Sequence, residues 1–201
     1  MLNTNLTRMA FLPLLLASAI LPVQAANISG KVIVPRAPNN QDVVIYIDKI
    51  PGKVFAPPAK PEILDQLNLK FVPHVLPILV GTTVQFPNSD LVRHNVFSPG
   101  PVQKFNLGTY PVGKSATRVF KDPGVVTLLC NIHAEMSGYV VVTETPYYAK
   151  SDAQGNFTIP NVPPGRYVLR AWHEKYPKVP PREITVTADD LKDVNFDLSK
   201  K

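Results

Sequence analysis

The hydrophobic and polar positions along this chain follow a β pattern. Residues 28–34 alternate apolar and polar side chains, and residues 43–47 form an almost unbroken β-branched run. Alternation is typical of a half-buried strand, and a short apolar run is typical of a strand buried on both faces. Because no long segment repeats with a helical period, we predict an all-β chain.

Between residues 67 and 143 the same pattern continues as a series of short apolar segments. Turn sequences such as Asn88-Ser89-Asp90 and Pro99-Gly100-Pro101 separate these segments. Many short strands at regular spacing predict a β-sandwich or a barrel. We expect strands over residues 67–72, 75–80, 82–86, 96–97, 102–107, 117–120, 125–129 and 138–143.

Proline is the compositional outlier, with 22 of 201 residues. This is about double the usual share, and proline breaks the interior of helices. Residues 51–61 are rich in proline, so we expect an irregular segment there. The two helix candidates are short, near residues 62–67 and 188–192.

After residue 148 the pattern indicates a second, small antiparallel module. We expect Tyr147 and Tyr148 to pack at the junction with the preceding region. The strands expected in this module cover residues 157–159, 167–172, 184–187 and 194–198.

Residues 1–25 have the pattern of a secretory signal peptide. Arg8 is followed by an apolar run from Met9 to Val23, and Val23-Gln24-Ala25 supplies small residues at a cleavage site. The run is short for a membrane span, which needs about 20 residues. We predict cleavage after Ala25, a periplasmic location and no integral membrane span afterwards. The alternative is an uncleaved N-terminal anchor.

The formal net charge is +6 and would fall by one with the loss of Arg8. Basic and acidic residues are interspersed, so the chain lacks the basic stripe of a nucleic-acid-binding protein. We expect no nucleic-acid partner.

The lone cysteine, Cys130, excludes an intramolecular disulfide. A free thiol is a liability in an oxidising compartment, so a bond that occupies it is expected. Cys130, His133 and Met136 form a C-x2-H-x2-M loop between two predicted strands. His94 lies 36 residues before Cys130, after the Asn88-Ser89-Asp90 turn.

A thiolate and two imidazoles with a weak axial thioether make a copper site. The soft sulfur atoms favour Cu(I), the imidazoles also serve Cu(II), and a rigid β-scaffold limits rearrangement when an electron moves. We therefore predict one copper ion held by His94, Cys130, His133 and Met136. The alternative is a chance alignment of a buried cysteine, a surface histidine and a core methionine.

Several segments resemble the cupredoxin, or type 1 blue copper, family over about residues 62–145. The motifs that show this resemblance are Gly81-Thr82-Thr83-Val84, His94-Asn95-Val96-Phe97-Ser98, Phe120-x-x-Pro123-Gly124 and the short, amicyanin-like loop from Cys130. The resemblance implies a Greek-key sandwich with His94, Cys130 and His133 as equatorial ligands and Met136 as the axial ligand. It also implies that the Asn95 N–H donates to the cysteine sulfur, while the Asn95 side chain ties the ligand loops together.

Residues 151–157 and 162–169 resemble the carboxypeptidase regulatory-like, transthyretin-like β-sandwich. That family begins with a G-x-V strand, which here is Gly30-Lys31-Val32, far from the rest. We therefore expect a discontinuous regulatory-like module of residues 27–52 and 147–201, with a cupredoxin domain of residues 53–146 inserted. The alternative assigns the early strands to the cupredoxin. His74 and His173 are expected to be packing or surface residues rather than metal ligands.

The cupredoxin resemblance implies a periplasmic carrier of single electrons between redox protein partners, such as a cytochrome or a dehydrogenase. His133 would be the ligand at the solvent edge, with Ile132 and Ala134 in an apolar docking patch. Fusions of this kind resemble proteins labelled methylamine utilisation proteins. The alternatives are copper storage or delivery, and a non-redox interaction module of the envelope. We expect no enzyme and no catalytic residues, because no H-x-H pair is present.

Overall fold

The computed structural model describes residues 24–199. All of the regular secondary structure in this range consists of β-strands. The all-β prediction is therefore confirmed for this part of the chain. None of its segments forms a helix that is long and apolar enough to cross a membrane. The predicted signal peptide, residues 1–25, lies almost wholly outside the described residues.

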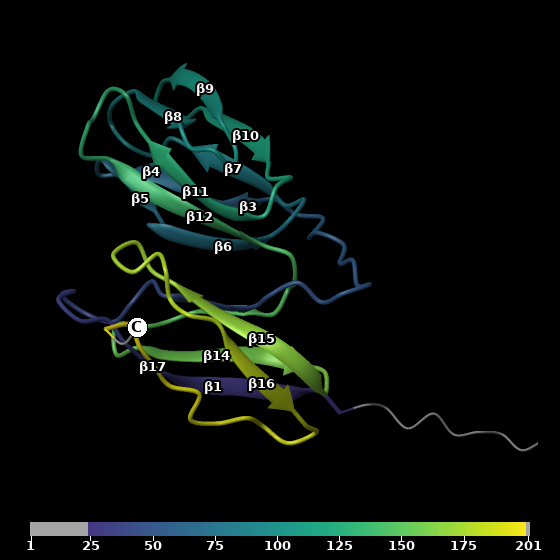
Figure 1. Cartoon of the computed structure of the whole chain (residues 1–201). Helices are drawn as coiled ribbons and strands as arrows, with labels where there is room; N and C mark the ends of the chain where they lie inside the picture. The colour runs from purple at the N-terminus through teal and green to yellow at the C-terminus, as the bar shows by residue number, and fades with distance from the viewer. Residues whose placement is uncertain (1–23, 200–201) are drawn as a thin grey trace, which may run out of the picture.

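The upper half of Figure 1 is a sandwich of two sheets, called here the upper sandwich. Its core is a cluster of buried side chains from both sheets, with Phe86, Phe120 and Leu128 fully buried. The larger sheet has the order β6 (Val75–Leu79), β12 (Ser137–Thr143), β11 (Gly124–Leu129), β8 (His94–Ser98) and β9 (Phe105–Tyr110). The smaller sheet has the order β10 (Ser115–Val119), β7 (Thr83–Pro87) and β3 (Glu62–Ile63).

Both helix predictions are wrong. The first candidate contains β3, which pairs with β7, and β4 (Asp65–Leu67), which pairs with β5 (Lys70–Val72). The second candidate bends and contributes only the bridge between Leu191 and Ile28. Segments of five or six residues are too short to hold a helix by themselves, so pairing with neighbouring strands decides their conformation.

The strand predicted over residues 67–72 is also wrong, because it is broken by a tight turn. Asn68 and Leu69 have φ angles of 53° and 57°, and they join β4 to β5 as a hairpin. Two consecutive residues with positive φ are typical of a two-residue hairpin turn. The other predicted strands are found, although the strand predicted over 102–107 begins later, at Phe105.

The lower half of Figure 1 is a second sandwich, the lower sandwich. Its core is a separate cluster of buried residues that includes Ile28, Ile45, Ile159 and Leu169. Within the described residues, sheet pairing joins the first two strands to the last five. One sheet has the order β13 (Tyr148–Lys150), β2 (Val44–Ile47), β15 (Gly165–Trp172) and β16 (Arg182–Val186). The other has the order β14 (Asn156–Val162), β1 (Ala26–Ile33) and β17 (Phe196–Asp197).

The two sandwiches meet through a small buried cluster of Val44, Val75, Val141 and Trp172. The Trp172 ring lies against Tyr139 of β12, with 5.1 Å between the ring centroids. Tyr147 packs on the core of the lower sandwich, and its ring contacts Phe55 in the irregular segment between residues 51 and 61. The junction therefore lies beside β12, the strand that begins directly after Met136.

Candidate metal centre

The C-x2-H-x2-M sequence forms the hairpin loop between β11 and β12. The pairing of Leu129 with Ser137 closes the strands below the loop. Above it, the Cys130 N–H donates to the Met136 carbonyl at 3.3 Å, and the Met136 N–H donates to the His133 carbonyl at 3.0 Å. Cys130 and Met136 therefore sit opposite each other at the base of the loop.

His94 reaches the same place from the neighbouring strand. It is the first residue of β8, which lies beside β11 in the sheet with Phe97 paired to Leu129. Its side chain is fully buried. Sheet pairing thus brings together residues that are 36 positions apart in the sequence.

The donor atoms of His94, Cys130 and His133 converge. The Cys130 Sγ lies 4.0 Å from His94 Nδ1 and 3.8 Å from His133 Nδ1, and the two Nδ1 atoms lie 3.2 Å apart. Within residues 24–199, these three side chains form the one group of three or more histidine, cysteine or acidic residues arranged to hold a metal.

These separations fit a single transition-metal ion. Metal–nitrogen and metal–sulfur bonds of roughly 2.0–2.3 Å, at angles near trigonal or tetrahedral, place the donor atoms roughly 3.3–3.7 Å apart. The observed 3.2 to 4.0 Å lie close to this range. One thiolate with two imidazoles, near a methionine, is the donor set of a type 1 copper site.

Met136 is buried, with 1% of its surface exposed, and it belongs to the same core cluster as Cys130. Its backbone lies opposite Cys130 at the base of the loop, where the Met136 carbonyl accepts the Cys130 N–H. Its role as the axial ligand stays a prediction.

Asp90 holds the far side of the His94 ring and was missed by the sequence analysis. The His94 Nε2–H donates to Asp90 Oδ2 at 3.0 Å, which leaves the lone pair of Nδ1 facing the thiol. The same carboxylate accepts the N–H groups of Leu69 and Leu91. These backbone hydrogen bonds, the Leu69 bond first, hold the pKa of Asp90 below its usual value. The signal in the sequence is an acidic residue four positions before the histidine.

Asn95 links three segments around the site. Its Nδ2 donates to Asn106 Oδ1 at 2.8 Å and to the Gly108 carbonyl at 2.9 Å, both in β9. The Asn131 N–H in the ligand loop donates to Asn95 Oδ1 at 3.5 Å. The side chain therefore connects β8 to β9 and to the loop. The hydrogen bond from the Asn95 N–H to the sulfur stays a prediction.

A polar pair, the partly buried Tyr110 and the fully buried Gln66, supports the strands behind the site. Tyr110 pairs with His94 across β8 and β9, and its hydroxyl donates to the Phe86 carbonyl at 2.9 Å. The fully buried Gln66 donates through Nε2 to the same hydroxyl at 2.6 Å. Burial raises the pKa of Tyr110 to about 12. The sequence did not predict this pair, because Gln66 lies in a segment for which a helix was expected.

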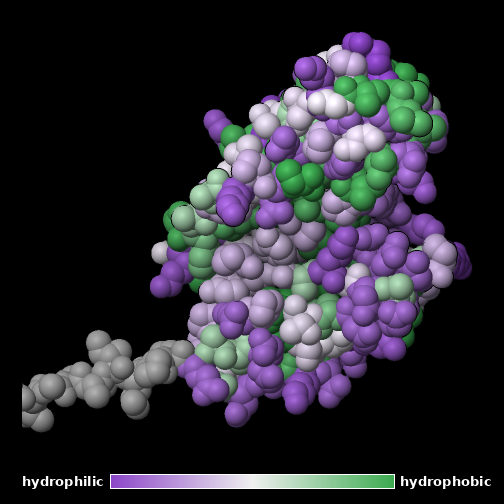
Figure 2. Space-filling view, turned by 180° about the vertical axis from the view of Figure 1, so that it is seen from behind, coloured by the Kyte–Doolittle hydropathy of each residue, from purple (hydrophilic) through white to green (hydrophobic). Residues whose placement is uncertain are grey.

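The loop side of the site faces solvent. His133 is half-buried, while Ile132 beside it is 47% exposed. Leu91 and Val92, in the loop that leads to His94, are also exposed. Seen from behind, hydrophobic residues gather near the top of the upper sandwich, whereas the lower sandwich is mostly hydrophilic (Figure 2).

His74 and His173 do not join the cluster of His94, Cys130 and His133. The His74 ring contacts the Ser137 carbonyl and Glu174, and His173 Nδ1 accepts the Lys175 N–H. Desolvation by burial lowers the pKa of His173.

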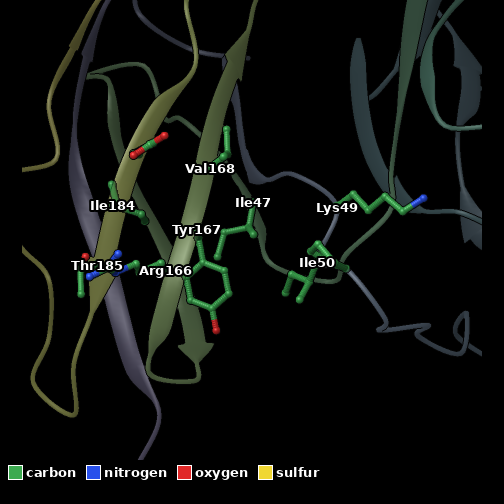
Figure 3. A pocket seen from close by; sticks show the side chains of 10 residues that line it. Ile47, Lys49, Ile50, Arg166, Tyr167, Val168, Ile184 and Thr185 are labelled. Carbon is green, nitrogen blue, oxygen red and sulfur yellow. The ribbon is translucent and has the colours of Figure 1, made fainter.

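A cavity of about 530 Å³ lies on the lower sandwich. Tyr167 and Val168 of β15 and Ile184 of β16 help to line it (Figure 3). It shares no residue with the cluster of His94, Cys130 and His133.

Comparison with known proteins finds similarity to proteins of both kinds. The family model of the carboxypeptidase regulatory-like domain matches residues 133–199, and the similar solved structures include cupredoxins. A purple cupredoxin from Nitrosopumilus maritimus is 30% identical, with 41% of this chain and 99% of that chain covered and a TM-score of 0.39. A reduced amicyanin variant is 25% identical, with 47% and 96% covered and a TM-score of 0.40.

A copper-containing nitrite reductase from Thermus scotoductus is also similar. It is 29% identical, with 49% of this chain covered and a TM-score of 0.41. This chain spans 25% of the length of that protein.

Proposed function

We propose that this chain is a periplasmic type 1 copper protein that carries single electrons between redox protein partners. The observation that carries this proposal is the convergence of His94 Nδ1, His133 Nδ1 and Cys130 Sγ within 4.0 Å of one another. Cys130, His94, His133 and Met136 would hold one copper ion, which supplies a centre that changes oxidation state by one electron.

The surroundings of the donors suit electron transfer. His94 and Cys130 are buried, and the ring of His94 is fixed by Asp90 on the side away from the thiol. Hydrogen bonds across the loop base fix Cys130 relative to Met136. Because the chain holds the donors in place, little rearrangement accompanies a change of charge at the site.

The exposed edge of the site suits brief encounters with a partner. Ile132 and Ala134 flank the half-buried His133 in the sequence and are exposed, and Leu91 and Val92, in the loop before His94, are exposed as well. Small interfaces of this kind are typical of weak redox encounters. A cytochrome or a dehydrogenase would dock here, and the protein itself would not act as an enzyme.

The compartment follows from the predicted signal peptide. Cleavage after Ala25 would release the chain into the periplasm, where copper bound to Cys130 would protect the lone thiol. In this proposal residues 53–146 form the copper domain. Residues 27–52 and 147–201 form the regulatory-like module, in line with the pairing of β1 and β2 with β13 to β17.

Titration of the mature protein with Cu(II), followed by visible and electron paramagnetic resonance spectroscopy, tests the proposal. One equivalent should produce an intense thiolate-to-copper band. Cys130→Ser should remove that band, and His173→Gln, which changes a histidine outside the cluster, should keep it. A wild-type protein that stays colourless, or a Cys130→Ser protein that stays blue, would overturn the proposal.

Voltammetry of the copper-loaded protein separates the carrier from the alternatives. A reversible one-electron wave supports an electron carrier. Bound copper without a reversible wave contradicts the role of an electron carrier and favours copper storage or delivery.

A further inference from the structure

The segment before β6 holds the start of β12, just after the ligand loop. The His74 Nδ1 lies 3.2 Å from the Ser137 carbonyl oxygen, and the Tyr139 N–H donates to the His74 carbonyl at 2.8 Å. Ser137 directly follows Met136. His74 therefore contacts the segment directly after the loop through both its ring and its backbone.

The other side of the His74 ring reaches the lower sandwich. His74 Nε2 lies 3.2 Å from Glu174 Oε2, and Glu174 follows Trp172, the last residue of β15. The Tyr139 ring packs edge-on against His74, with the centroids 5.4 Å apart. A chain of contacts thus runs from the lower sandwich through Glu174 and His74 to Ser137.

The loop end is pressed tightly against this segment. A side chain at Gly138 would place its Cβ 2.9 Å from the Cβ of Phe71 and 3.2 Å from the His74 carbonyl. Contacts this short are closer than packed carbon atoms allow. A displacement of the His74 backbone toward Gly138 would therefore be passed on to the start of β12.

We propose that Glu174 and His74 are positioning residues for the metal centre, through which the lower sandwich fixes the loop end that carries Met136. This inference rests on the proposed copper site for its effect on the reduction potential. A weak, long bond from an axial thioether tunes that potential. A small shift of the backbone at Ser137 moves Met136 and thereby changes the potential.

The mechanical part of the inference is tested on the metal-free protein. Glu174→Ala and His74→Ala should each speed hydrogen exchange at the Tyr139 amide several-fold. The exchange rate in the double variant should be close to that of each single variant, because the two residues act through the same series of contacts. Glu144→Ala is the matched control. It removes a carboxylate of similar exposure that pairs with Lys49 at 3.5 Å, and it should leave the exchange unchanged. Wild-type exchange in both single variants would overturn the link.

The effect on the centre is tested by voltammetry of the copper-loaded variants. Glu174→Ala and His74→Ala should shift the reduction potential in the same direction, while Glu144→Ala keeps the wild-type value. Unchanged potentials in both single variants would refute the positioning role even if hydrogen exchange changes. A chain that binds no copper would refute the proposed function, and the exchange experiment would still decide the link between the sandwiches.

Discussion

Asp90 Oδ2 lies 3.0 Å from Nε2 of the fully buried His94. The contact selects the tautomer that leaves Nδ1 free to bind a metal. Partners of this kind orient metal-binding histidines, and their loss lowers metal affinity by roughly 10–100-fold. We predict a loss of this size for copper in Asp90→Ala, measured by competition with a chelator of known affinity.

Asp90→Asn is the control for this prediction, because an amide oxygen still accepts the hydrogen bond from His94. Its affinity should lie between those of the wild type and Asp90→Ala. If Asp90→Ala binds copper as tightly as the wild type, the carboxylate does not orient the ring.

Met136→Leu should keep copper bound and raise the reduction potential. A thioether donates weakly to Cu(II) and stabilises it, and leucine removes this donor while keeping a similar buried volume. Met136 is 1% exposed, so a change in solvent access is a small effect. Voltammetry of the two proteins in one buffer measures the shift.

The control for this prediction is a substitution at Leu128, which is buried in the same core cluster as Met136. Met9 cannot serve as a control, because it lies in the predicted signal peptide. Leu128→Met changes a buried side chain by the reverse substitution and should have a smaller effect on the potential. An unchanged potential in Met136→Leu would show that Met136 is not the axial donor.

The ligand set was open to prediction because its chemistry is confined to few residues. Cys130 is the lone cysteine, and His133 and Met136 follow it within one hairpin loop. The structure brings the donor atoms of His94, Cys130 and His133 close together, while their role as metal ligands stays a prediction. The contact between Asp90 and His94 was harder to predict from the sequence. An aspartate in an Asn-Ser-Asp turn is already explained by its ordinary role in the turn.

The wrong secondary-structure predictions have a common physical cause. Gln66 lies in a segment with a short helix-like pattern, yet its backbone pairs with Phe71 and its side chain binds the Tyr110 hydroxyl, 44 residues away. Contacts between distant parts of the chain outweigh local propensity in so short a segment. Only the folded arrangement reveals these partners.

Asp152 gives the lower sandwich a predictable dependence on pH. Its Oδ1 accepts the N–H groups of Gln154 and Asn156, and its Oδ2 accepts a hydrogen bond from the Asn156 side chain. These bonds, the Asn156 side-chain bond first, hold the pKa of Asp152 below its usual value. A lowered pKa in the folded state means that the carboxylate stabilises the fold above its unfolded pKa of about 3.9.

We therefore predict that Asp152→Ala has a lower melting temperature than the wild type at pH 7. The difference should shrink as the pH falls from about 4 through the lowered pKa, because the wild type then loses the same contribution. Thermal unfolding at a series of pH values measures it. Asp122→Ala serves as the control, since the exposed Asp122 side chain makes no hydrogen bond within residues 24–199. A difference that stays constant at every pH would contradict the prediction.

Tyr110→Phe should destabilise the fold by about 1–3 kcal/mol, the usual cost of leaving buried polar groups without partners. The substitution keeps the ring but removes the hydroxyl, which donates to the Phe86 carbonyl and accepts from Gln66 Nε2. Gln66 is fully buried, and its Oε1 has no hydrogen-bond partner among the described residues, so the amide would retain only its bond to the Pro87 carbonyl. Urea unfolding of metal-free protein measures the loss. Tyr147→Phe is the matched control, because no hydrogen bond of the Tyr147 hydroxyl is found within residues 24–199, and it should change the unfolding free energy little. Equal stability of Tyr110→Phe and the wild type would mean that the Gln66 amide finds another partner.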